Sequence, residues 1–206
     1  CYDNAGTPTL EFTAWTNTTT RATALAYQDG VLSKTGVLTR RYLGTFHTTA
    51  TTTTEDSKAN RYLWNYYNRV TRNGLGSFSA SRSTTSTTFV ELNTEIEIKF
   101  ILGVSEDAVF VSANGSQTNS NVNNVVGGIA FDTFTSVEVG MEVMSVPGAG
   151  VNSTTFAVSG RKIGLAVGKH IASVVGHAGA GGGTATWTGS TGADAVKTSL
   201  HLGLSG

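Results

Sequence analysis

Apolar and polar residues alternate along much of this chain, and this period of two constrains the fold more than any other feature. Glycine, asparagine or serine clusters close each alternating run. The runs are residues 9–14, 61–67, 95–102, 109–111 and 136–143. Successive side chains of a strand face opposite sides, so each run predicts a strand with one buried face and one wet face. Their repetition along the chain predicts an all-β fold, either an antiparallel β-sandwich or a jelly-roll-like arrangement.

Polar and glycine-rich segments mark the expected connections. The pairs of tight turns at residues 28–30 and 33–36 predict short strands on either side. Threonine-rich residues 48–54 and polar residues 114–124 predict loops. Residues 55–60 predict one short helical turn, because two acidic residues stand at its start.

The glycine-rich residues near 176–183 predict a flexible hairpin loop. Residues 1–206 are expected to form a single β-rich domain, which a longer chain can contain as a fragment. Cys1 is the single cysteine, so no internal disulfide forms. Cys1 is expected either to lie part-way along a longer polypeptide or to be the acylated start of a lipoprotein.

The charge content excludes several partners. The chain has 14 basic and 14 acidic residues among 206, a net charge of zero, and 14% charged residues overall. Nothing in this balance attracts nucleic acid or an anionic membrane, and no apolar run is long enough for membrane insertion. Solubility must come from hydroxyl groups instead, which 33 threonines supply. Threonine is β-branched and therefore also favours strands.

The ionisable residues do not form a catalytic pattern. A glycosidase needs two carboxylates roughly 5–10 Å apart across a cleft, and the adjacent acids Glu55-Asp56 and Glu106-Asp107 point apart in extended chain. No Gly-x-Ser-x-Gly elbow is present. The histidines lack the spacing of a zinc site; they are His47, His170, His177 and His201. We therefore expect no enzyme activity, no metal site and no cofactor.

The aromatic residues are the strongest site candidates. Trp and Tyr combine a flat apolar face with a polar edge, which suits a sugar ring or a partner protein. The candidates for ligand or subunit contact are Trp64, Tyr66, Tyr67 and Trp187. The same side chains would also fill a two-sheet core, and the sequence leaves these alternatives open. Nearby arginines would pair with acids or stack on the rings.

Several segments resemble the C-terminal module of bacteriophage and prophage virion structural proteins of the tail-fibre-like or head-fibre-like kind. The segments are residues 16–31, 40–46, 54–57, 64–70, 184–189 and 202–206. The resemblance implies a role on a virion and a β-rich, trimeric body. The family has no catalytic signature to transfer, so the resemblance implies no site residues.

The expected function is that of a virion structural protein, located at the extracellular virion surface. It would form a fibre, spike or capsid-decorating domain for host-surface attachment or particle stability. The expected partners are further copies of the chain in a homotrimer, other virion proteins and a host cell-surface glycan. Trimer formation is expected to bury apolar residues that one chain leaves half exposed, namely Ile101, Val104, Phe110 and Leu202.

The leading alternative is a carbohydrate-binding module of a bacterial surface or secreted protein, which would use exposed aromatic rings. A polysaccharide-degrading tailspike is the third possibility. It would need paired acids in a groove and a larger domain than 206 residues supply.

Overall fold

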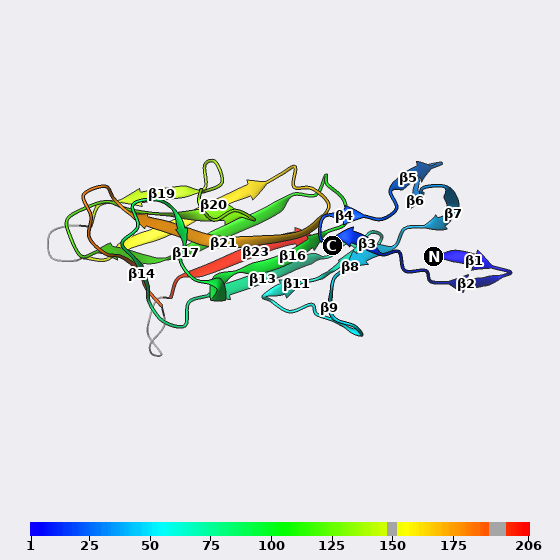
Figure 1. Cartoon of the computed structure of the whole chain (residues 1–206), viewed down its shortest axis with the longest axis horizontal. Helices are drawn as coiled ribbons and strands as arrows, with labels where there is room; N and C mark the ends of the chain where they lie inside the picture. Colours follow the sequence, from blue (N-terminus) through cyan, green and yellow to red (C-terminus); the bar gives the residue numbers. More distant parts are fainter. Residues whose placement is uncertain (148–151, 190–196) are drawn as a thin grey trace.

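The computed structural model describes residues 1–147, 152–189 and 197–206. Two six-stranded sheets pack face to face as a sandwich, and a row of small hairpins extends from one end (Figure 1). Paired strands are antiparallel except for one short parallel pair, β11 (Asn60–Arg61) with β16 (Ile98–Leu102). The expectation of an all-β, antiparallel sandwich is therefore confirmed.

We name each sheet after its long central strand. The β21 sheet has the order β11, β16, β21, β18, β19, and β15 also pairs with β21. Its further strands are β15 (Val90–Glu91), β18 (Val125–Phe131), β19 (Glu142–Ser145) and β21 (Gly168–Ala178).

The β17 sheet has the order β13, β23, β17, β22, β14, and β20 also pairs with β17. Its strands are β13 (Thr71–Ser77), β14 (Arg82–Thr84), β17 (Val109–Asn119), β20 (Thr154–Lys162), β22 (Ala185–Trp187) and β23 (Ser199–Ser205).

Residues 1–59, which we call the N-terminal segment, form only small sheets. The pairs within the segment are β1 with β2, β3 with β4, and β9 with β10; β5, β6 and β7 form a three-stranded sheet, and β8 pairs with β12, which follows the segment. The bounds are β1 (Tyr2–Asn4), β2 (Thr7–Thr9), β3 (Trp15–Asn17), β4 (Thr20–Arg21), β5 (Leu25–Gln28), β6 (Val31–Lys34), β7 (Val37–Arg41), β8 (Gly44–Phe46), β9 (Thr48–Ala50), β10 (Thr53–Thr54) and β12 (Leu63–Asn65).

Tryptophan rings fill the interior where glycines leave room. Trp187 on β22 crosses from the β17 sheet to Gly127 and Gly176 of the β21 sheet, and a Cβ at either glycine would lie closer than 3.0 Å to its ring. The Trp64 ring likewise lies against a glycine, Gly103, where a Cβ would be closer than 3.0 Å to the ring. Both rings are fully buried. Close packing of this kind makes the core sensitive to single methyl groups.

The two sheets differ on their outer sides. Val174 and Val175 are neighbours on β21 and so face opposite sides, yet both are fully buried. On β17, by contrast, Val109 and Val111 are buried while Phe110 between them is 58% exposed. The β17 sheet therefore keeps a free outer face.

Some sequence expectations were wrong because tertiary pairing outweighed local composition. Residues 55–60 form bends and an isolated bridge between Asp56 and Arg61, with no helical turn. The described residues contain instead a 3-10 turn at Thr94–Ile96, where the Asn93 side chain accepts the Glu95 N–H. Residues 114–119 continue strand β17, and residues 48–54 form the β9–β10 hairpin.

Two alternating runs and one loop also differ from expectation. Residues 10–14 are not a strand, and Val139 lies in a turn with 93% of its side chain exposed. Residues 176–178 belong to β21, and the glycine-rich loop after them leads to β22 in the other sheet. It is a crossover between sheets and not a hairpin. The turn at Asp29 and Gly30 is confirmed, with φ values of 49° and 80°.

The glycine under Trp64 gives a direct test of the packing. Gly103→Ala is expected to lower the free energy of unfolding by about 1–3 kcal/mol, because the new methyl group overlaps the Trp64 ring. The matched control is Gly203→Ala on β23, where a Cβ meets only the Asn73 side chain at 3.8 Å. Urea unfolding of both variants measures the difference; equal midpoints would contradict the packing described here.

Candidate functional site

Trp64 anchors a cluster of aromatic and charged side chains at the end of the sandwich nearest the N-terminal segment. Its Nε1–H donates to Asp107 Oδ2 at 2.9 Å. Asp107 also forms an ion pair with Arg69, whose guanidinium carbon lies 4.5 Å from the Trp64 ring centroid. The buried carboxylate is thus satisfied by one neutral and one charged donor.

The N-terminal segment contributes two further members of this cluster. The Tyr42 ring stacks on Trp64 with centroids 6.1 Å apart. Arg21 donates to the Gly103 carbonyl at 2.6 Å and to the Tyr42 hydroxyl at 3.2 Å. Burial raises the pKa of Tyr42, so its hydroxyl stays neutral. We call Arg21, Tyr42, Trp64, Tyr66, Arg69 and Asp107 the aromatic cluster; it ties the N-terminal segment to the sandwich.

Two tyrosines continue the aromatic cluster to the surface. Tyr66 is half-buried and meets Tyr67 edge-on at 5.0 Å between ring centroids. Tyr67 is 52% exposed and lies beside the Arg41 guanidinium. The hydroxyl groups of Tyr66 and Tyr27 are 3.3 Å apart, and Tyr27 is also exposed. These tyrosines offer aromatic surface to a partner.

The four aromatic candidates from the sequence therefore divide into two groups. Trp64 and Trp187 are core side chains with no exposed surface, so of the alternatives that the sequence left open the core position holds for both. Tyr66 and Tyr67 remain available for contact. Of the four apolar residues expected at a trimer contact, only Phe110 is exposed, because Ile101, Val104 and Leu202 are buried within one chain.

The adjacent acids Glu55 and Asp56 are each occupied by partners within the chain. Glu55 accepts hydrogen bonds from Ser57 and Asn60, and Asp56 pairs with Arg61 and Arg72. Within residues 1–147, 152–189 and 197–206, no group of three or more His, Cys, Asp or Glu side chains is placed to hold a metal ion. Sequence reasoning missed Arg21 and the bond of Asp107 to Trp64, because these contacts join segments far apart in the chain.

His170 is the most strongly held histidine. Its Nδ1 lies 2.7 Å from Asp132 Oδ2 and its Nε2 lies 2.8 Å from the Ala166 carbonyl. Burial disfavours the charged imidazole, but these two acceptors outweigh burial and raise the pKa of His170. Burial likewise opposes the Asp132 carboxylate, yet the bonds from His170 and the Ile171 N–H lower the pKa of Asp132.

Comparison with known proteins does not identify a family. No family model matches the chain, and no curated protein matches it either. The part of the chain that the structure describes contains no helix both long and apolar enough to cross a membrane.

The His170–Asp132 pair predicts a pH-dependent stability. The contribution of His170 is complete below its ordinary pKa of 6.5 and is lost as pH rises through its raised pKa. The contribution of Asp132 is complete above its ordinary pKa of 3.8 and is lost as pH falls through its lowered pKa. Both contributions are complete between pH 3.8 and pH 6.5. The loss of melting temperature caused by Asp132→Asn is therefore expected to be largest in this range.

A matched control exists for this substitution. Asp29→Asn changes another aspartate with positive φ, 49° against 59° at Asp132, but in an exposed turn. It is expected to leave the melting temperature nearly unchanged across the same pH range. A melting-temperature loss for Asp132→Asn that stayed constant from about pH 5 to about pH 9 would refute the charged pair.

The two buried tryptophans allow a second comparison. Trp64→Phe removes the bond to Asp107, whereas Trp187 Nε1 has no hydrogen-bond partner. Both substitutions replace a fully buried indole with a smaller phenyl ring, so the loss of packing is similar. Because only Trp64→Phe also removes a hydrogen bond, we expect it to destabilise the fold by about 1–3 kcal/mol more than Trp187→Phe. Chemical unfolding monitored by circular dichroism measures both. An equal loss, or a larger loss for Trp187→Phe, would show that the Asp107 bond adds no stability.

Proposed function

We propose that this chain is a non-catalytic structural domain of a bacteriophage virion, of the fibre, spike or capsid-decorating kind, and that it assembles as a homotrimer at the particle surface. The observation that carries the proposal is the N-terminal segment, which exposes apolar side chains and has almost no core of its own. The resemblance of several segments to virion structural proteins supports the same reading.

Exposed apolar residues gather in the N-terminal segment. Of the buried core cluster, this segment supplies only Leu32. The exposed large side chains are Leu10, Phe12, Tyr27, Val37, Leu38, Leu43 and Phe46. Phe12 is 76% exposed, although its ring meets Phe46 edge-on. A cluster of exposed apolar side chains supports a role in contact with a partner.

Two-stranded hairpins such as those of the N-terminal segment are marginally stable in water on their own. Figure 1 shows them extending beyond the sandwich, with β1 and β2 farthest from it. The aromatic cluster anchors this segment to the sandwich but leaves its large apolar side chains exposed, and a further surface would cover them. Identical copies suit this role, since a net charge of zero lets them approach without overall repulsion. A closed assembly of copies would also cover the exposed strand edges.

A carbohydrate-binding module remains the second candidate. Trp64 and Trp187 no longer support it, because both rings are buried. Phe110, which is exposed on the free outer face of the β17 sheet, supports it instead. Sugar binding at Phe110 is also compatible with a virion fibre that attaches to a host glycan.

The proposal predicts a defined trimer in solution. Size-exclusion chromatography with light scattering should give three times the chain mass of 21.4 kDa. Phe12→Glu places a charge among the exposed apolar side chains of the N-terminal segment and is expected to shift the protein toward monomer. Val139→Glu, at a side chain that is 93% exposed on the sandwich, should leave the trimer intact.

A monomer at micromolar concentration would count against the assembly, and so would a trimer that Phe12→Glu leaves unchanged. Circular dichroism confirms that both variants keep their strands, since each changes a side chain that one chain already exposes.

A further inference from the structure

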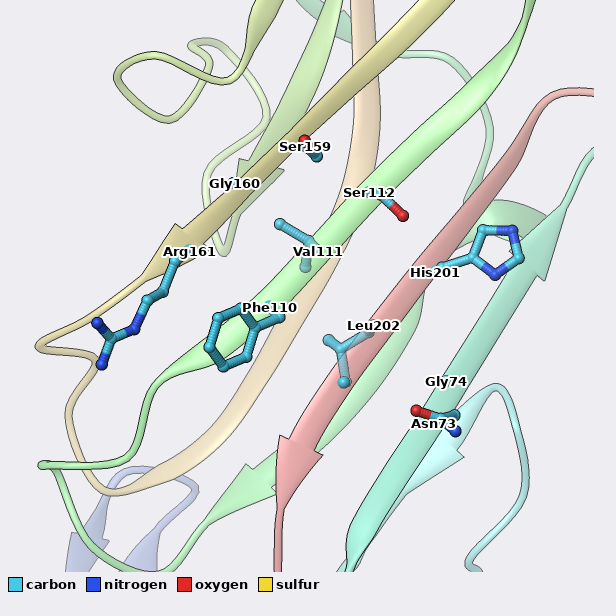
Figure 2. A pocket seen from close by; sticks show the side chains of 11 residues that line it. Asn73, Gly74, Phe110, Val111, Ser112, Ser159, Gly160, Arg161, His201 and Leu202 are labelled. Atoms are coloured by element: carbon cyan, nitrogen blue, oxygen red, sulfur yellow. The ribbon is translucent and has the colours of Figure 1, made fainter.

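The free outer face of the β17 sheet carries a shallow hollow of about 600 Å³. Strands β13, β23, β17 and β20 lie side by side beneath it, and Figure 2 shows the side chains that line it. The hollow lies outside the aromatic cluster and the N-terminal segment.

Strand register explains why this face is hollow. Asn73, Gly203, Phe110 and Arg161 are aligned across the four strands. Gly203 has no side chain, so a gap separates Asn73 from Phe110. A Cβ at Gly203 would meet no atom closer than 3.8 Å. The neighbouring outward-facing row supplies polar groups, from His201, Ser112 and Ser159.

Phe110 is the aromatic side chain of this hollow, whose lining is both apolar and polar. Its ring is 58% exposed, and the Arg161 guanidinium carbon lies 5.6 Å from its centroid (Figure 2). The exposed ring gives a flat surface on which the C–H face of a sugar ring can pack. Side-chain hydroxyl, amide and imidazole groups around it match the hydroxyl groups of a sugar.

The charge of the hollow selects among sugars. Arg161 and His201 are its ionisable side chains, and no Asp or Glu lines it. Within the described residues Arg161 takes part in no ion pair. A guanidinium without an acidic partner can bind a carboxylate through two parallel hydrogen bonds.

We propose that this hollow binds an acidic saccharide, a sugar that bears a carboxylate such as a uronic acid. The sugar ring packs on Phe110, the carboxylate pairs with Arg161, and His201, Ser112 and Asn73 bond to ring hydroxyls. This inference goes beyond the structural role proposed above, because it assigns a ligand to the β17 sheet, whereas the assembly is argued from the N-terminal segment. It takes Phe110 as a ligand contact and not as the subunit contact expected from the sequence.

Titration calorimetry with two trisaccharides of equal length, one of galacturonic acid and one of galactose, tests the proposal. The acidic trisaccharide should bind about tenfold more tightly than the neutral one. Arg161→Gln should abolish this preference, and Phe110→Ala should weaken binding of both sugars about tenfold. Phe12→Ala, which removes an exposed phenylalanine elsewhere, should leave both affinities unchanged.

Three results would overturn the proposal: no binding of either trisaccharide at millimolar concentration, equal affinity for the two, or Arg161→Gln without effect. Light scattering on the same variants separates this test from that of the assembly. A changed oligomer mass for Phe110→Ala would assign the ring to a subunit contact and refute the saccharide site. An unchanged mass with lost binding supports the site, whether or not the protein is a trimer.

Discussion

Burial of the inner faces of the two six-stranded sheets against each other is the interaction on which the rest of this structure depends. Trp187 of the β17 sheet lies on Gly127 and Gly176 of the β21 sheet. The chain has few charges, so the cohesion comes mainly from this apolar contact and from strand pairing. The aromatic cluster at the end of the sandwich then holds the N-terminal segment, because Trp64 bonds to Asp107 while Tyr42 and Arg21 pack beside it.

The surface of the molecule divides into parts with different physical character. The β21 sheet is buried on both sides at Val174 and Val175, whereas the β17 sheet exposes Phe110 and His201 on its outer side. The N-terminal segment is held to the sandwich by the aromatic cluster and exposes several large apolar side chains, among them Leu10 and Phe12. A structural role in an assembly and a binding role for a free sheet face are therefore compatible within one chain, since they use different residues.

The alternation of apolar and polar residues predicted the fold class and which side chains of the central strands are buried. Val109 and Val111 are buried and Phe110 is exposed, as a period of two requires. The same pattern failed at residues 10–14, where no neighbouring strand pairs with the chain. Composition failed at Gln117 and Asn119: these polar residues suggested a loop, yet both are buried in a paired strand. Pairing between distant segments decided these cases, and a single sequence does not show it.

The candidate site was only partly predictable, because its contacts also join distant segments. The sequence singled out four aromatic residues, but it could not separate the buried Trp64 and Trp187 from the accessible Tyr66 and Tyr67. Arg21 reaches Gly103 across more than eighty residues of chain, and the row from Asn73 to Arg161 exists only through strand register. Such contacts depend on topology and have no local signature.

The most direct test of this account is amide hydrogen exchange measured at high and at low protein concentration. Amides of β17 and β21 should stay protected at both, because one chain buries them by itself. Amides of the hairpins β1 to β7 should be protected only at the concentration at which copies assemble. Equal protection of these hairpins in a dilute, monomeric sample would contradict the claim that other copies are needed to cover the N-terminal segment.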